Sequence, residues 1–316
     1  MKRYLTGSIQ QDLREKMVFL GGPRQVGKTT LALSLIPGAD ETHPAYLSWD
    51  VPASQQLLLR GGLPADQSLI VLDEIHKYKR WRNLVKGFYD RYKSRKQFLV
   101  TGSARLDHYR RGGDSLQGRY HYYRLHPLSL HEINTRPRAS DLETLLRFGG
   151  FPEPFLKQDT RHWKRWQRER QSRVIQEDLI SLEQVREASQ LQLLAQLLPQ
   201  RVGSVLSIAN LGQDLSVAFE TADKWVTIFE NLYYCFRIMP YGLPQLRTVK
   251  NGKPEFAVEC KSGGRALRRN IAYFAQRTAI PEFYQTHLEA GGQDTEWPDA
   301  RARIIPFVRL CELLKL

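Results

Sequence analysis

The sequence predicts an α/β fold in which a parallel sheet is covered by helices on both faces. Over residues 1–130, short apolar runs alternate with helix-like segments, which is the pattern of parallel strands joined by crossover helices. The first of these runs also leads directly into a glycine-containing loop and then into a helix-forming segment. Residues 81–92 have helical apolar spacing and predict a helix before the fourth strand. The expected strands are residues 17–20, 46–49, 69–72, 98–101 and 120–125.

The loop after the first expected strand has the spacing of a phosphate-binding loop. Gly22 and Gly27 can adopt backbone angles that other residues resist, so successive N–H groups can turn toward one anion. We expect Lys28 to reach the β- and γ-phosphates of a nucleotide and Thr29 to ligate Mg²⁺. The alternative is a chance match in a glycine-containing turn, and the flanking strand and helix argue against it. The expected nucleotide-binding residues are Gly22, Pro23, Arg24, Gln25, Val26, Gly27, Lys28, Thr29 and Thr30.

Two carboxylates end the third expected strand. Because ligands of parallel sheets lie at the carboxyl ends of the strands, Asp73 and Glu74 should lie beside the phosphate-binding loop. There Asp73 would hold Mg²⁺ and Glu74 would orient and deprotonate an attacking water. The alternative is that both residues only cap the following helix. Glu74 favours hydrolysis over mere binding, because binding a nucleotide requires no base.

Three further polar positions are candidates for the same site. Thr101 and Ser103, at the end of the fourth strand, could sense the γ-phosphate, although Ser103 is an equally good helix N-cap. Asp50 ends the second strand at the same sheet edge, and a turn-capping role is the more common one for an aspartate there. Arg119 precedes the fifth strand and is the candidate arginine finger for a neighbouring subunit, ahead of Arg110 and Arg111. An ordinary surface arginine is the alternative for Arg119.

A cluster of helix-breaking residues at 148–154 marks a boundary in the chain. The basic stretch that follows, residues 161–170, contains Trp163 and Trp166 on one helical face, together with Arg170. One reading is a nucleic-acid-binding arm. The favoured reading is an amphipathic helix whose tryptophans lie in a core bordered by arginine stems.

The last third of the chain changes character. Short helices at residues 191–195 and 207–211, a turn at Gly212 and a longer helix at 221–236 suggest a helix-turn-helix or its winged variant. Its second helix begins with acidic residues, so protein packing is at least as good a reading as DNA recognition. Glu259 and Lys261, at the end of a later strand, match half of a nuclease metal site, but residues 241–254 contain no aspartate to complete it.

The bulk composition predicts a soluble, intracellular protein. The formal net charge is +14, which fits contact with a polyanion such as nucleic acid or, equally, a solubilising surface. Cys235, Cys260 and Cys311 have no paired spacing and read as reduced thiols. No signal peptide or membrane span is recognisable, so we expect a cytoplasmic protein without a membrane partner.

Taken together, these motifs resemble the prokaryotic AAA+ ATPases that carry a C-terminal domain of unknown function. In that family an ATPase core with a five-stranded parallel sheet precedes a winged-helix region and a restriction-endonuclease-like fold. Here the segment between residues 243 and 255 is far shorter than in the family, so the last domain is apparently shortened. The resemblance is carried by residues 22–30, 72–77, 101–103, 116–119, 149–152 and 240–241.

The resemblance implies four regions and a function. The regions are an ATPase core at 1–130, a helical connector or lid at 131–185, a winged-helix-like domain at 186–240 and a small, shortened α+β domain at 241–316. The implied function is Mg·ATP hydrolysis that switches conformation on a partner, with nucleic acid and a second copy of the chain as candidate partners. The alternatives are a nucleotide-gated DNA-binding module with little turnover and a metal-dependent nuclease.

Overall fold

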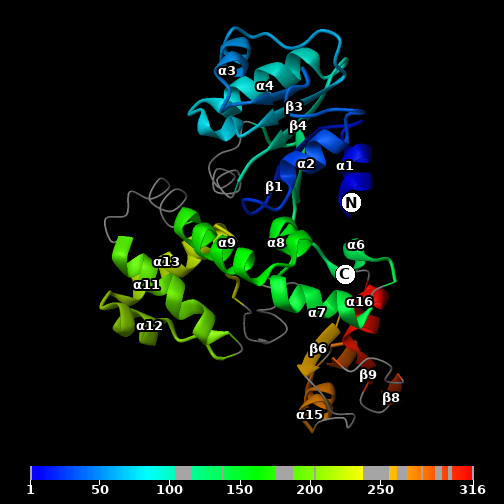
Figure 1. Ribbon diagram of the computed structural model, residues 1–316, viewed down its shortest axis with the longest axis vertical. Coiled ribbons are helices and arrows are strands. Elements are labelled where there is room, and N and C mark those ends of the chain that lie inside the picture. Colours follow the sequence, from blue (N-terminus) through cyan, green and yellow to red (C-terminus); the bar gives the residue numbers. More distant parts are fainter. Residues whose placement is uncertain are drawn as a thin grey trace. The chain divides into compact units, whose positions relative to one another are not determined.

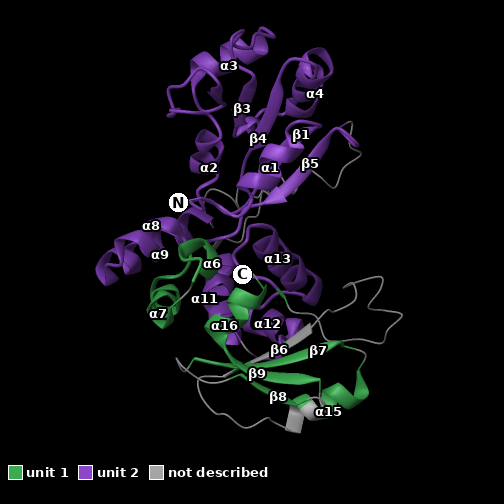
Figure 2. Cartoon of the chain, turned by 90° about the vertical axis from the view of Figure 1, so that its right-hand side faces the viewer, with its two compact units in different colours: residues 1, 128–150, 237–316 green, residues 2–127, 151–236 purple. Residues whose placement is uncertain are grey.

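The computed structural model describes residues 2–103, 116–136, 138–174, 188–202, 204–237, 256–261, 269–278, 280–288, 294–297 and 301–314. The chain divides into two compact units, which we call the large and the small unit (Figure 2). The large unit combines Lys2–Pro127 with Phe151–Phe236, and the small unit combines Leu128–Gly150 with Arg237–Leu316. None of the described helices is long and apolar enough to span a membrane.

The large unit contains a five-stranded sheet in which every neighbouring pair of strands is parallel, in the order β2-β3-β4-β1-β5. Strands β1, β3 and β4 are labelled in Figure 1. The expected parallel sheet is therefore confirmed, and the strand that leads into the phosphate-binding loop lies between two others. All five strands run in the same direction, so their carboxyl ends share one edge. The strands are β1 (Met17–Gly21), β2 (Tyr46–Ser48), β3 (Leu69–Asp73), β4 (Gln97–Thr101) and β5 (Tyr120–Arg124).

Both faces of this sheet are covered, which explains why its inner strands are apolar at nearly every position. Alternate residues of β1 enter two separate cores: Met17 and Phe19 pack with α3 (Pro52–Leu59) and α4 (Trp81–Tyr92). Val18 and Leu20 pack with α1 (Thr6–Asp12) and α2 (Lys28–Ser34) on the other face. The helix expected at residues 81–92 is confirmed as α4, whose Trp81, Val85 and Phe88 are buried.

The rest of the large unit is helical. Helix α8 (Pro152–Lys157) leads into α9 (Thr160–Arg173), where Trp166 is buried and packs on Phe151. The reading of α9 as an amphipathic helix with tryptophan in a core is confirmed for Trp166, whereas Trp163 is only half-buried. A separate core joins α11 (Ala188–Leu197), the 3₁₀ turn η4 (Leu198–Arg201), α12 (Ile208–Leu215) and α13 (Phe219–Asn231).

One expectation for this helical region is wrong. Gly212 does not form the turn between two helices but lies inside α12. A Cβ at Gly212 would lie 2.9 Å from the Val217 carbonyl oxygen, so glycine is needed there for close packing. The turn comes at Ser216, whose φ of 54° ends α12. The wing of a winged helix would fall after residue 237, outside the described residues, so that feature stays a prediction.

The small unit contains a four-stranded sheet in the order β6-β7-β9-β8, with β8 antiparallel to β9. Phe283 and Ala302 pack with α15 on one face, and Tyr284 and Ile305 pack with α16 on the other. Leu130, Leu142 and Cys311 form a further small core. The elements are α6 (Leu130–Ile133), α7 (Ala139–Phe148), β6 (Phe256–Lys261), α15 (Arg269–Arg277), β7 (Glu282–His287), β8 (Thr295–Trp297), β9 (Ala302–Pro306) and α16 (Phe307–Leu314).

Candidate nucleotide and magnesium site

The glycine-containing loop joins β1 to α2 at the carboxyl edge of the sheet. Gly22 has a φ of 147° and Gly27 a φ of 93°, both in the region that side chains with a Cβ disfavour. A Cβ at Gly22 would also lie 2.5 Å from the Leu125 carbonyl oxygen. The loop conformation therefore depends on these two glycines, as the spacing predicted.

The ammonium of Lys28 is folded back into the loop. Lys28 is buried, and its Nζ donates hydrogen bonds to the carbonyl oxygens of Gly22 (3.1 Å) and Pro23 (2.7 Å). A phosphate oxygen carries negative charge that these carbonyls lack, so a phosphate at this position would be a stronger partner for the ammonium. Lys28 lies in the loop, where the sequence placed it.

Arg3 braces the same loop, a role that the motif analysis missed. Its Nη1 donates to the Val26 carbonyl at 2.8 Å, and its Nη2 donates to the His126 carbonyl at 2.6 Å. The guanidinium thus ties the start of the chain to the loop and to the segment that follows β5. No local sequence signal distinguishes Arg3 from the other arginines, because both of its partners are distant in the sequence.

Asp73 lies at the centre of a group of hydroxyls. Its carboxylate accepts hydrogen bonds from Thr29 Oγ1 (3.3 Å), Tyr46 OH (2.5 Å) and Thr101 Oγ1. The structure therefore brings together Thr29, Asp73 and Thr101, as expected, and adds Tyr46. Burial, followed by the hydrogen bond to Asp73, raises the pKa of Tyr46 far above its usual range, so the phenol remains a donor.

These oxygen donors suit a magnesium ion. Mg²⁺ prefers carboxylate and hydroxyl oxygens and keeps several water ligands of its own, so a site with one carboxylate and one threonine fits it. Thr29 and Asp73 would hold the ion, while Thr101 and Tyr46 orient the Asp73 carboxylate. Tyr46 was detectable in principle, because it opens the strand that pairs with β3.

Glu74 follows Asp73 with a left-handed φ of 54°, which turns its side chain away from the strand direction. Burial and the neighbouring Asp73 charge raise the pKa of Glu74, whereas Lys77, Lys28 and Arg24 act in the opposite direction. Lys77 Nζ lies 3.5 Å from the Glu74 carboxylate and 2.6 Å from that of Asp50. The same cation thus links two carboxylates at the mouth of the site.

A hollow of about 260 Å³ joins these residues. Asp50 belongs to its wall, so the residue for which turn capping was the favoured role lies at the site. Ser103 is buried just beyond β4, and the residues after it lie outside the described residues, so its capping role stays untested. The lining is Arg24, Gln25, Gly27, Lys28, Thr29, Asp50, Asp73, Glu74 and Lys77.

Arg119 lies at the opposite edge of the sheet. Its carbonyl oxygen accepts a hydrogen bond from the N–H of Met17, where β1 begins, whereas the loop starts where β1 ends. Arg119 Nε donates to Asp90 at 3.0 Å. Within one chain it therefore does not line the nucleotide site, and a finger role would require a second chain. Arg110 and Arg111 fall outside the described residues.

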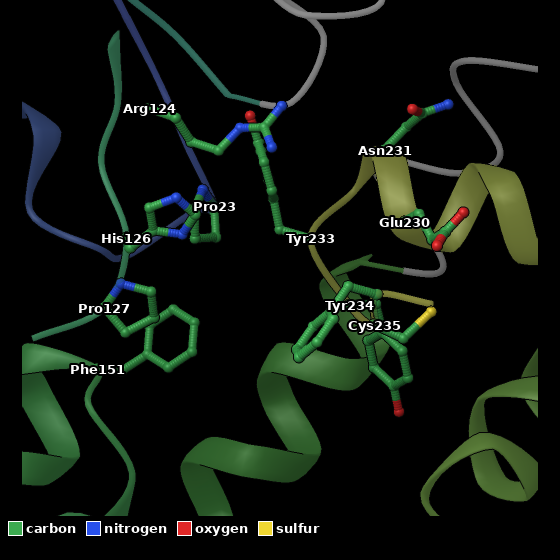
Figure 3. A pocket seen from close by; sticks show the side chains of 11 residues that line it. Pro23, Arg124, His126, Pro127, Phe151, Glu230, Asn231, Tyr233, Tyr234 and Cys235 are labelled. Atoms are coloured by element: carbon green, nitrogen blue, oxygen red, sulfur yellow. The ribbon is translucent and has the colours of Figure 1, made fainter. Parts of the chain in front are cut away.

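A larger cavity, of about 960 Å³, borders the loop at Pro23 (Figure 3). The Arg124 guanidinium lies 4.9 Å from the ring centroid of Tyr233, and Figure 3 shows the two side chains together. Phe151 and His126 line the same space, and burial together with the Arg124 charge lowers the pKa of His126. The cavity lining is rich in aromatic rings and includes the charged residues Arg124 and Glu230, whereas most residues that line the small hollow are charged.

The nuclease-like half-motif lies in the small unit. On β6, Glu259 is paired with Gln285 and Lys261 with His287 of β7, which brings no second carboxylate to this register. Among the residues that the structure describes, no group of three His, Cys, Asp or Glu side chains could hold a metal. Residues 241–255 lie outside the described residues.

Comparison with known proteins divides the chain into two matched regions. Residues 14–134 match a family model described as an AAA domain, and residues 139–255 match one described as a domain of unknown function. The uncharacterized proteins Rv2008c of Mycobacterium tuberculosis and Mb2031c of Mycobacterium bovis are each 26% identical over 243 residues, covering 75% of this chain and 54% of theirs. This chain thus spans about half the length of the curated relatives that it matches.

Among solved structures, the RuvB Holliday junction branch migration motor of Thermotoga maritima aligns with 18% identity and a TM-score of 0.36. The alignment covers 78% of this chain and 93% of that one.

Proposed function

We propose that the chain, whose residues 14–134 match a family model described as an AAA domain, is an AAA+ ATPase that binds and hydrolyses Mg·ATP and uses the cycle as a conformational switch on a partner. One observation carries this proposal: Lys28, Asp73 and Glu74 converge on one hollow at the carboxyl edge of the sheet. An anion-binding loop, a metal-holding carboxylate and a candidate base are the three groups that nucleotide hydrolysis needs together.

Each residue has a distinct role in the proposed reaction. The loop N–H groups and the Lys28 ammonium bind the phosphates, and the bound phosphate replaces the carbonyls of Gly22 and Pro23 as the partner of Lys28. Thr29 and Asp73 hold Mg²⁺, which neutralises phosphate charge when bound. Glu74 accepts a proton from the water that attacks the γ-phosphorus, and the bond from this phosphorus to the β–γ bridging oxygen breaks, so that ADP leaves with that oxygen. The aromatic cavity beside Pro23 is large enough for the nucleoside.

The cycle acts beyond the ATPase core. The cavity next to the loop is lined both by residues at the end of β5 and just beyond it (Arg124, His126 and Pro127) and by residues at the end of α13 and just beyond it, between 230 and 236. A ligand that fills this space would therefore contact two distant parts of the chain and change how they pack. The same proposal includes the four regions of the chain, with boundaries at residues 130, 185 and 240. It also includes a sensor role for Thr101 and Ser103, a homo-oligomeric assembly and a cytoplasmic location.

Two substitutions test the proposal. Glu74→Gln should keep ATP affinity and lower turnover by at least ~100-fold, because the amide cannot accept the proton. Lys28→Ala should weaken both binding and turnover. Glu143→Gln, on an exposed position of the small unit, is the matched control and should behave as wild type. The measurements are phosphate release and nucleotide titration calorimetry, each with and without Mg²⁺.

The outcomes separate the candidate functions. Normal turnover in Glu74→Gln removes Glu74 from its role. Tight nucleotide binding with negligible turnover in the wild type favours a nucleotide-gated binding module. No heat with any nucleoside triphosphate in the presence of Mg²⁺ would remove the site altogether.

A further inference from the structure

Helix α4 and its flanks concentrate positive charge. Residues 77–96 contain nine lysines and arginines and one acidic residue, Asp90, within a chain whose net charge is +14. Much of the excess therefore lies on one segment rather than being scattered over the surface. The basic residues are Lys77, Lys79, Arg80, Arg82, Lys86, Arg91, Lys93, Arg95 and Lys96.

The fold turns this charge outward. Trp81, Val85 and Phe88 bury one face of α4 against the sheet, so the opposite face is left to polar side chains. Lys79, Arg80, Lys93 and Arg95 are exposed, and Lys86 is half-buried. Arg14 is exposed beside the end of α4, across a hollow of about 280 Å³ that Lys93 and Arg95 also line. We call these six residues (Arg14, Lys79, Arg80, Lys86, Lys93 and Arg95) the α4 basic surface.

The acidic residue of the segment is hydrogen-bonded to an arginine outside this surface. Asp90 is engaged by Arg119, whose Nε lies 3.0 Å from its carboxylate, and that hydrogen bond lowers the pKa of Asp90. Within the described part of the chain, Lys79, Arg80 and Arg95 have no ion-pair partner. Lys86 and Lys93 also act on Asp90 through their charges, so the surface holds six cations near one acidic side chain. Lys86 lies on α4, Lys79 and Arg80 precede the helix, and Lys93 and Arg95 follow it.

A second basic helix of the large unit differs in this respect. On α9, Arg165 and Arg173 both pair with Glu169, and Arg170 lies over the ring of Phe151. The guanidinium groups of these three arginines therefore have partners within the chain. The α4 basic surface is the better candidate for an external polyanion.

The chemistry of the surface selects the kind of polyanion. None of the exposed large hydrophobic side chains in the described residues lies between positions 77 and 96, so α4 offers nothing to insert into a membrane. It equally offers no exposed aromatic ring on which unpaired bases could stack. A helix of 12 residues is roughly 18 Å long, which spans about five phosphates of one strand of a duplex.

From these observations we propose that the α4 basic surface binds the phosphate backbone of double-stranded nucleic acid without reading its sequence. The surface lies on the sheet face opposite α2, on the helix that follows the acidic strand β3. It deepens the proposed function by naming the partner class, but binding there does not depend on hydrolysis. A chain that fails to hydrolyse ATP would still bind the duplex.

The test is fluorescence anisotropy with a labelled duplex of about 20 base pairs, titrated between roughly 50 and 200 mM KCl. For the wild type, affinity should fall with salt. The triple variant Lys79→Gln/Lys86→Gln/Lys93→Gln should bind at least ~10-fold more weakly, and its log–log salt slope should be smaller by about 2.7, near 0.9 for each lost phosphate contact. Lys79→Arg/Lys86→Arg/Lys93→Arg should retain binding.

A matched variant removes the same charge elsewhere: Lys164→Gln/Arg165→Gln/Arg168→Gln on α9 should leave the salt slope unchanged. Unfolding midpoints of all variants establish that each is folded. Lys28→Ala should retain duplex binding, which separates this proposal from the nucleotide site. The proposal is overturned if the wild type does not bind, if the α4 variant binds as the wild type, if the α9 variant loses as much, or if anionic lipid vesicles or single strands bind more tightly than the duplex.

Discussion

Glu74, the proposed base, has neighbours that act on its pKa in opposite directions. Its side chain is mostly buried, with 21% of its surface exposed, and it follows directly after Asp73, so both burial and charge favour the protonated form. Lys77 and Lys28 favour the ionised form that can accept a proton. Burial and a neighbouring charge of the same sign are the means by which proteins raise the basicity of a carboxylate for proton transfer.

Removing Lys77 should shift this balance in a measurable direction. In Lys77→Met the cation 3.5 Å from the Glu74 carboxylate is lost, so the pKa of Glu74 rises further. Because the base works only when deprotonated, the acidic limb of the turnover–pH profile should move to higher pH, with activity lost earlier as pH falls. Lys164→Met, on the exposed face of α9, is the charge-matched control. An unmoved acidic limb in Lys77→Met would show that Glu74 does not set it.

At the scale of elements, one glycine is required by the backbone conformation and another could be replaced by alanine. Gly22 holds a φ of 147° with the Leu125 carbonyl in the way of any Cβ, so the loop between β1 and α2 needs it. Gly87 lies in the middle of α4 on an exposed position, and a Cβ there would meet nothing within 4 Å. A helix interior gains from alanine because alanine loses less backbone entropy on folding.

The two glycines therefore give a paired prediction. Gly87→Ala should raise the free energy of unfolding by roughly 0.5–1 kcal/mol. Gly22→Ala should lower it and weaken nucleotide binding, because the loop must shift to remove the contact with Leu125. Chemical denaturation of both variants, with nucleotide titration of Gly22→Ala, checks the pair. Equal stability of the two variants would contradict the assignment of the loop conformation.

At the scale of the whole molecule, the parallel sheet separates Arg119 from the nucleotide site of its own chain. The loop and the two carboxylates lie at the carboxyl edge, and Arg119 lies where β5 begins. An arginine so placed can stabilise phosphate charge only in another copy of the chain. Arg119 can therefore act as an arginine finger only if copies of the chain assemble.

A mixing experiment tests both. Arg119→Ala and Glu74→Gln should each be inactive alone. Mixed in equal amounts, they should recover up to about a quarter of wild-type turnover, since half of the sites keep Glu74 and half of their neighbours keep Arg119. Asp90→Asn, which removes the partner of Arg119 within the chain, is the control for an indirect effect on folding. No recovery in a mixture that demonstrably assembles would exclude the finger role.

The sequence by itself determined the sheet and the position of the site. The five strands, the loop at residues 22–29, the paired acids Asp73 and Glu74, and the helix at 81–92 all follow from patterns that span fewer than about fifteen residues. Such patterns encode their structure locally, through backbone freedom, apolar periodicity and the rule that parallel strands share a carboxyl edge.

Only the tertiary structure decided which distant side chains complete the site. The Tyr46 hydroxyl on Asp73, the Arg3 brace on Val26 and the Lys77 link from Asp50 to Glu74 join residues of separate elements. Gly212 was misplaced for the same reason, since its contact with Val217 depends on how α12 packs. Side-chain contacts across elements depend on how the whole chain packs, and no short sequence pattern specifies that packing.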